Sequence, residues 1–107
     1  MLLGNLFESL VALSIRTYAQ RCTAELSHLR VDNGRHEVDF IVETGDGVLA
    51  VEVKLASDAD DHDVRHLRWL QEVLGTNLLD AVVITTGPEA YRRPDGIAVV
   101  PLGLLGK

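Results

Sequence analysis

Hydrophobic residues along the chain recur first at helical spacing and then at the alternating spacing of strands. Between residues 3 and 22 they follow a helical repeat, which predicts a first helix with one wide apolar stripe. Short runs rich in β-branched residues follow, separated by the turn sequences Asp-Asn-Gly and Thr-Gly-Asp-Gly. They predict three strands, over residues 25–31, 36–43 and 48–55.

The second half of the chain predicts one more helix and two more strands. The acidic residues between Ser57 and Asp63 are typical of a helix N-terminus, and an apolar stripe continues from there to Gly75. Residues 80–86 predict a buried strand, and residues 97–101 predict a short edge strand that ends at a proline. A strand, helix and strand in succession normally form a right-handed parallel crossover. The expected fold is therefore α/β, with the order αβββαβ, a mixed central sheet and an added edge strand.

The turn between the second and third strands decides which residues lie opposite one another. A two-residue loop at residues 46–47 places Asp39 opposite Lys54, whereas a loop at residues 45–46 places it opposite Glu52. Side chains alternate along a strand, so both registers put Asp39, Glu52 and Lys54 on one face. Their apolar neighbours on this face indicate a cleft partly covered by protein. The opposite face is expected to be core and comprises Val38, Phe40, Val42, Leu49, Val51, Val53 and Leu55.

Two carboxylates and one ammonium group on a shared face suit the hydrolysis of phosphodiester bonds. Asp39 and Glu52, on adjacent strands, can hold one Mg²⁺ ion, and the backbone carbonyl of Val53 is a further candidate ligand. Lys54 can orient and help deprotonate an attacking water, or neutralise charge that develops on the phosphate. The alternative interpretation is that the three side chains form cross-strand ion pairs on a solvated sheet face.

Length and composition indicate how many domains the chain forms and in which cellular compartment it works. With 107 residues, 47% of them hydrophobic, the chain is expected to form a single domain over residues 1–107. Its one cysteine, Cys22, lies among apolar helix residues and indicates packing, so we expect a reducing, cytoplasmic environment. The apolar N-terminus carries Glu8 and Arg16 and lacks a basic leading segment, which predicts neither a signal peptide nor a membrane anchor.

Charge and the remaining side chains limit the choice of partners. The formal net charge of -6 has the wrong sign for a protein that coats nucleic acid nonspecifically. Bound metal or gathered arginines would have to offset that charge locally. His62 and His66 have the spacing of zinc ligands but no evident third ligand, which favours surface histidines. Trp69 points away from the apolar stripe of its helix, where it either packs under a loop or, if exposed, suits a partner surface or a homodimer contact.

Two neighbouring segments of the chain match a known nuclease motif. The sequence from Gly34 to Val42, followed by that from Leu49 to Leu55, resembles the Asp and Glu-x-Lys motif of the PD-(D/E)XK nuclease superfamily. More narrowly, the chain is similar to the nuclease-like domain that follows the ATPase module in many bacterial and archaeal AAA-type ATPases. The resemblance implies a restriction-endonuclease-like core, in which helices flank a mixed central sheet, and hydrolysis of DNA that depends on Mg²⁺ or Mn²⁺.

The resemblance also implies roles for individual residues. Asp39, Glu52 and Lys54 match the catalytic residues of the motif, with the two carboxylates as metal ligands. Glu8, on the predicted first helix, matches a glutamate that helps to hold metal-bound water in related enzymes. Gln71 lies on the inner flank of the second helix, where some members of the superfamily have a glutamine that faces the site.

Two departures from the family pattern leave two hypotheses. Val38 stands where the superfamily name puts proline, and the G-x-x-x-x-G-K-[ST] motif of an ATPase does not occur. The chain is therefore expected to be a free-standing relative or a fragment of a longer protein with an ATPase domain. The first hypothesis is a metal-dependent nuclease acting on DNA. The second is a catalytically silent nuclease-like module that binds DNA, an ATPase partner or another copy of itself.

Overall fold

Six strands and one α-helix make up the part of the chain that the structure describes. The structure is a computed structural model, and it describes residues 25–31 and 35–104. The predicted helix over residues 3–22, which carries Glu8, lies outside these residues. Within them, no helix is long and apolar enough to span a membrane. The elements follow in the order β1 (Glu25–Val31), β2 (His36–Thr44), β3 (Gly47–Lys54), α2 (Arg65–Leu74), a 3-10 turn (Gly75–Asn77), β4 (Leu78–Thr85), β5 (Tyr91–Arg92), β6 (Ala98–Pro101) and a 3-10 turn (Leu102–Leu104).

The strands form one mixed sheet in the order β1-β2-β3-β4-β6-β5, which confirms the prediction of a mixed sheet. β1, β2 and β3 pair antiparallel, whereas β3, β4 and β6 pair parallel, with α2 in the crossover between β3 and β4. The prediction that the last strand lies at an edge is wrong. β6 lies between β4 and the short strand β5, because the N–H of Arg93 donates to the carbonyl of Ile97 and turns the chain back.

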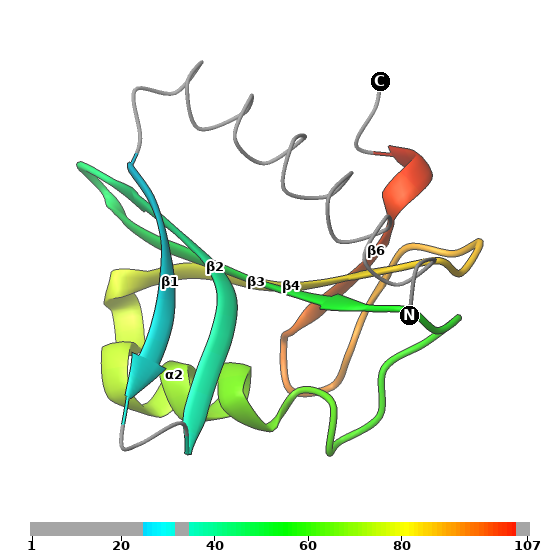
Figure 1. Ribbon diagram of the computed structural model, residues 1–107, viewed down its shortest axis with the longest axis horizontal. Coiled ribbons are helices and arrows are strands. Elements are labelled where there is room, and N and C mark those ends of the chain that lie inside the picture. The colour runs from blue at the N-terminus through cyan, green and yellow to red at the C-terminus, as the bar shows by residue number, and fades with distance from the viewer. Residues whose placement is uncertain (1–24, 32–34, 105–107) are drawn as a thin grey trace.

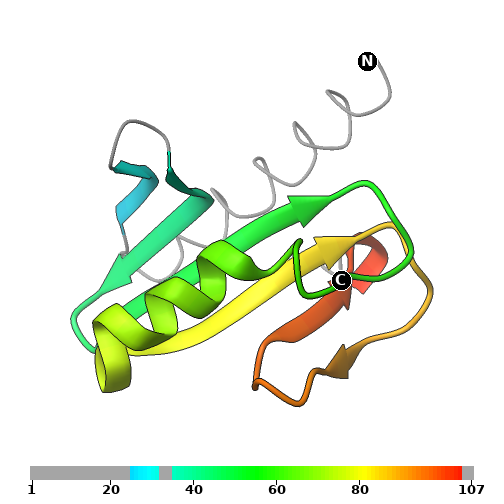
Figure 2. The same ribbon diagram turned by 90° about the horizontal axis from the view of Figure 1, so that it is seen from below.

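Apolar residues are buried on both faces of this sheet. Figure 1 shows α2 beneath the sheet, and Figure 2 shows it lying across the central strands, where it contacts β2, β3 and β4. The larger hydrophobic cluster lies on this face and comprises Val38, Ile41, Ala50, Ala59, Val64, Leu67, Leu70, Ala81, Val83, Ile97 and Val99. By strand alternation, a smaller cluster occupies the other face and comprises Phe40, Val42, Val51 and Ile84. The face predicted to carry the site is thus covered in part by α2, as expected.

The segment between β3 and α2 differs from its prediction. α2 begins at Arg65, so the prediction that a helix opens between Ser57 and Asp63 is wrong. The acidic residues bond one another instead, since the N–H of Asp60 donates to the Asp63 carboxylate and the N–H of Asp63 donates to the Asp60 carboxylate. Such side-chain acceptors give the backbone an alternative to helical hydrogen bonds. The predicted core residue Leu55 is 48% exposed, because it follows the end of β3.

A β-bulge interrupts β2 next to Asp39. The pairing of β1 with β2 shifts by one residue between Ser27 and Leu29, so Asp39 and Phe40 together face a single residue of β1. The extra residue changes the alternation on the N-terminal side of Asp39. Val38 is predicted on the same face as Phe40, but it packs in the cluster beneath α2. The pairing of β2 with β3 is regular from Phe40 to Thr44, so the bulge leaves the register of this hairpin unchanged.

Candidate functional site

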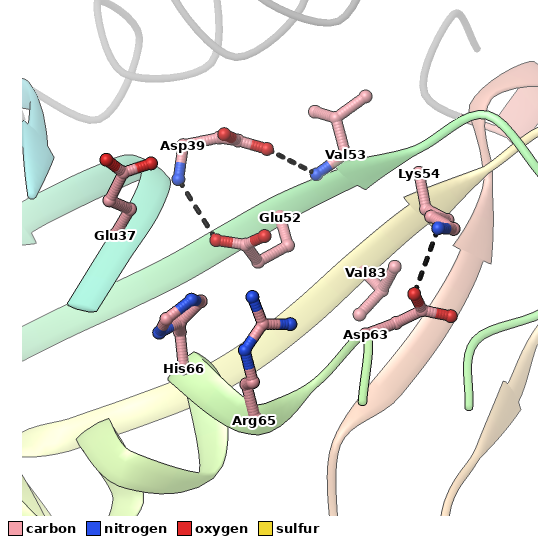
Figure 3. Close-up of a pocket in the computed structure, with 9 residues that line it drawn as sticks. All are labelled: Glu37, Asp39, Glu52, Val53, Lys54, Asp63, Arg65, His66 and Val83. Atoms are coloured by element: carbon pink, nitrogen blue, oxygen red, sulfur yellow. Dashed lines mark hydrogen bonds and ion pairs between the residues drawn. The ribbon is translucent and has the colours of Figure 1, made fainter. Parts of the chain in front are cut away.

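Side-chain hydrogen bonds join Asp39 and Glu52 at the point where the ladder between β2 and β3 ends. The last ladder pair on this side is Phe40 with Val51. Beyond it, the N–H of Asp39 donates to Glu52 Oε1 at 3.2 Å, and the N–H of Val53 donates to Asp39 Oδ2 at 2.8 Å (Figure 3). Each carboxylate therefore takes the place of a backbone acceptor on the neighbouring strand. This exchange brings the two acidic side chains together while the strands separate.

The hairpin turn sets this register. Thr44 pairs with Gly47, so the loop consists of residues 45–46, and of the two registers predicted the one that places Asp39 opposite Glu52 is correct. Gly47 has φ of 151°, and a Cβ atom there would lie 2.6 Å from the carbonyl oxygen of Asn77. Only glycine fits this close approach of β3 to the start of β4. The turn sequence therefore fixes the position of both carboxylates.

Burial and mutual repulsion act on the acidic pair. Burial raises the pKa of Asp39 above its ordinary value, and the hydrogen bond from Val53 opposes this rise only in part. Burial and then the negative charge of Asp39 raise the pKa of Glu52 to about 8. Arg65 lowers the pKa of Glu52 by a smaller amount, because its positive charge lies nearby. A cation bound in the pocket would therefore stabilise the ionised forms of both carboxyl groups.

Lys54 lies beside the acidic pair but forms an ion pair with a different residue. Its Nζ lies 2.9 Å from Oδ1 of Asp63, in the turn that precedes α2. Figure 3 shows the ammonium group directed toward Asp63. The side chain of Lys54 is 44% exposed, whereas that of Asp63 is 15% exposed. Lys54 therefore forms an ion pair, as the alternative interpretation predicts, but its partner lies outside the hairpin and not on the neighbouring strand.

One pocket collects these residues. Its volume is about 290 Å³, and it is lined by Glu37, Asp39, Glu52, Val53, Lys54, Asp63, Arg65, His66 and Val83. Asp39, Glu52 and Lys54 thus share one pocket, as the strand alternation predicts, and Val53 also lines it. Sequence reasoning missed Arg65 and His66, which begin α2. The predicted crossover could have indicated them, because ligands commonly bind at the carboxyl ends of parallel strands, close to where the following helix begins.

Of the two histidines predicted to lie at the surface, His62 is exposed, whereas His66 is only partly exposed. His66 is partly buried, and burial lowers its pKa, with the positive charge of Arg65 as a further cause. Its ring lies edge-on to that of His36, with centroids 5.8 Å apart. Trp69, predicted as a partner surface, stacks on His36 with centroids 4.0 Å apart and is only partly exposed. Because Trp69 packs within the protein, its position does not support the predicted homodimer contact.

One predicted site residue, Gln71, lies elsewhere, and another, Glu8, lies outside the described residues. Gln71 donates from Nε2 to the carbonyl of Asp95 at 2.9 Å, so it fastens α2 to the loop before β6. Of the described residues that line the pocket, none is Gln71, which corrects its predicted role. Glu8 falls outside the described residues, so its position beside the acidic pair stays a prediction.

The pocket offers two carboxylate side chains of the kind that a hard divalent cation prefers. Asp39 and Glu52 supply carboxylate oxygens, which Mg²⁺ and Mn²⁺ prefer, and Val53 has its backbone at the pocket wall. Within residues 25–31 and 35–104, no group of three or more His, Cys, Asp and Glu side chains is placed to hold a metal ion. Mg²⁺ is often bound through one or two carboxylates with several waters, so a pair is sufficient for it.

Arg93 joins the segment between β3 and α2 to the loop between β5 and β6. Its guanidinium donates to the carbonyl of Ala59 at 2.6 Å and to the carboxylates of Asp61 and Asp95. The side chain is only 11% exposed. The adjacent Arg92 points outward and pairs with both carboxylate oxygens of Asp80 at 3.0 and 3.1 Å. Arg93 thus holds the wall of the pocket that carries Asp63, whereas Arg92 supports the edge of the sheet.

Comparisons with known proteins give a family and no individual relative. No curated protein and no solved structure matches the chain. A family model described as a domain of unknown function (DUF4143) matches residues 3–105, nearly the whole sequence and all the described elements. The chain therefore belongs to the DUF4143 family.

Proposed function

We propose that this protein is a metal-dependent nuclease that hydrolyses phosphodiester bonds of DNA. The observation that carries the proposal is the meeting of Asp39 and Glu52 in one pocket with Lys54 at its wall. Acidic residues from adjacent strands and a lysine two residues beyond one of them are the parts that such hydrolysis needs. On this proposal the sheet and α2 belong to a restriction-endonuclease-like core of the PD-(D/E)XK type.

The proposed roles follow from the chemistry of each side chain. Asp39 and Glu52 bind Mg²⁺ or Mn²⁺ through carboxylate oxygens, with the Val53 carbonyl as a further ligand and Glu8 in support. When bound, the metal supplies a Lewis acid for the phosphate and the attacking water. Lys54 orients that water and balances negative charge on the phosphate. The water oxygen bonds to phosphorus and the bond from phosphorus to the leaving oxygen breaks. One proton of the water ends on the leaving oxygen, through solvent, so one strand end carries a phosphate and the other a hydroxyl.

A second function has one specific observation in its favour. The ion pair between Lys54 and Asp63 directs the ammonium group toward the turn before α2. A lysine held there suits a catalytically silent module that binds DNA, an ATPase partner or another copy of itself. Such modules keep a fold after the chemistry is lost, since function depends on the site more than on the fold.

A cutting assay separates these functions. Wild-type protein and Lys54→Ala are incubated with single-stranded, duplex and branched DNA in Mg²⁺, in Mn²⁺ and in chelator. The nuclease predicts cutting that needs metal, and a loss on the order of a hundredfold in rate for Lys54→Ala. A matched control is Arg68→Ala on the outer side of α2, which should cut at the wild-type rate. Absence of cutting on every DNA form, or full activity of Lys54→Ala, would refute the proposed mechanism.

A further inference from the structure

A second pocket adjoins the first at Asp39. Its volume is about 300 Å³, and it is lined by His28, Leu29, Arg30, Glu37, Val38 and Asp39. Glu37 and Asp39 line both pockets. The two pockets therefore meet along β2, one on the side of α2 and β3 and the other on the side of β1. Anything bound at the acidic pair has a neighbouring space toward β1.

Basic side chains stand on each side of the acidic pair. On the β1 side, His28 Nδ1 makes a short hydrogen bond to the backbone carbonyl of Asp39. Arg30 pairs through Nε with Glu37 at 3.0 Å, and the two side chains are 75% and 47% exposed. On the other side, Arg65 lines the first pocket. An exposed ion pair contributes little stability, and a guanidinium can bind a phosphate through two parallel N–H groups as it binds a carboxylate.

We propose that the second pocket binds the backbone phosphate next to the one that is cut, with Arg30 as its principal ligand. This inference rests on the proposed function, because it assumes that a DNA strand occupies the first pocket. The strand then runs over Asp39 toward β1, and its neighbouring phosphate displaces Glu37 from Arg30. His28 holds the Asp39 backbone between the two subsites. A substrate must therefore continue at least one nucleotide beyond the cut on the β1 side.

A salt titration of DNA binding tests the subsite directly. A fluorescein-labelled single-stranded oligonucleotide is titrated with wild-type protein, Arg30→Ala and Arg68→Ala, with Ca²⁺ in place of Mg²⁺ to prevent cutting. Loss of one phosphate contact should lower the slope of log affinity against log salt concentration by about 0.7. Between about 50 and 200 mM salt, the affinity of Arg30→Ala should therefore fall about 2.6-fold less than that of wild type. Arg68→Ala removes the same charge from a side chain that lines neither pocket, and it should keep the wild-type slope.

The other half of the ion pair gives an effect of opposite sign. Glu37→Gln removes the group that competes with phosphate for Arg30, so it should bind the oligonucleotide more tightly than wild type. A wild-type slope for Arg30→Ala would overturn the subsite, and so would the absence of oligonucleotide binding by wild-type protein. If inorganic phosphate displaces the oligonucleotide from wild type more readily than from Arg30→Ala, the two compete for Arg30 and the subsite is supported; equal displacement from both proteins would count against it.

Failure of the subsite and failure of the nuclease have different outcomes. A protein that cuts DNA in Mg²⁺ while Arg30→Ala binds like wild type keeps the proposed function and loses the subsite. A protein that never cuts but shows the lowered slope in Arg30→Ala loses the nuclease and keeps the subsite, as part of a DNA-binding module. Thermal unfolding of Arg30→Ala controls for its fold, and an exposed ion pair predicts little change.

Discussion

Replacing Glu52 with glutamine keeps the acceptor for the Asp39 N–H and removes one of two acidic groups from the pocket. The pKa of Glu52 is raised from 4.5 to about 8, first by burial and then by the charge of Asp39. A carboxyl group whose pKa is raised by folding stabilises the folded state fully below its unfolded pKa. That contribution is lost as the pH rises through the folded pKa. We therefore expect the free energy of unfolding of the wild type to fall from about pH 4.5 to above pH 8 in metal-free buffer.

The size of this loss follows from the same pKa. A rise from 4.5 to about 8 corresponds to an upper limit of about 5 kcal/mol. Glu52 is only partly buried, and solvent screens its charge, so we expect roughly 2 kcal/mol. Glu52→Gln should then be more stable than wild type by that amount at about pH 9 and equally stable at about pH 4. Saturating Mg²⁺ should reduce the wild-type loss, since a cation favours the ionised pair.

Urea unfolding at a series of pH values, in chelator and in Mg²⁺, measures this effect. Asp39→Asn is the matched control, because its amide oxygen can still accept the Val53 N–H while the charge that raises the pKa of Glu52 is gone. In that variant the loss of stability should be smaller and should end at lower pH, because the folded pKa of Glu52 is raised less. Parallel curves for wild type and Glu52→Gln across the whole range would show that Glu52 does not carry the raised pKa.

Three further predictions concern metal binding and stability. Asp39→Ala should lose both the heat of Mg²⁺ binding in calorimetry and any cutting; undiminished cutting would place the chemistry elsewhere. Arg93→Ala should lower the free energy of unfolding by about 2 kcal/mol, because it leaves the Ala59 carbonyl and Oδ2 of Asp95 without their guanidinium donor. Arg92→Ala, its exposed neighbour, should have a much smaller effect, and equal losses in urea unfolding would contradict this assignment. Leu67→Ala should cost about 3 kcal/mol, since Leu67 lies on α2 and is fully buried in the larger cluster, and a loss under about 1 kcal/mol would mean that α2 packs differently.

Patterns within a single strand or turn were sufficient to predict the centre of the sheet. The alternation from residue 40 onward and the Gly45-Asp46 loop determine which side chains of β2 and β3 meet, and the structure selects one of the two registers that the turn sequence allows. The buried strand predicted over residues 80–86 is β4, and its parallel pairing with β3 follows from the crossover. These features depend on neighbours close in sequence, which periodicity and turn chemistry describe well.

Features that depend on distant partners could not be predicted. The bulge at Asp39 arises from the register of β1, and nothing in β2 alone indicates an extra residue. Acidic residues are typical of a helix start, but Asp60 and Asp63 bond each other in a turn, and Asp63 then becomes the partner of Lys54. Gln71 has the right position on its helix, yet the loop at Asp95 provides its acceptor. In each case a contact made by the tertiary fold overrides a local preference.

The hydrogen bonds of Asp39 and Glu52 to the opposing strand affect how sequences of this family diverge. Because these carboxylates replace ladder acceptors, losing either one weakens the sheet even in a homologue that no longer needs the chemistry. Purifying selection for folding alone would therefore retain both positions, or replace them with asparagine and glutamine. Lys54 makes no such bond to the hairpin, and its ion pair with Asp63 is partly exposed. Among homologues, lysine at position 54 should therefore track retained activity more closely than the acidic pair does.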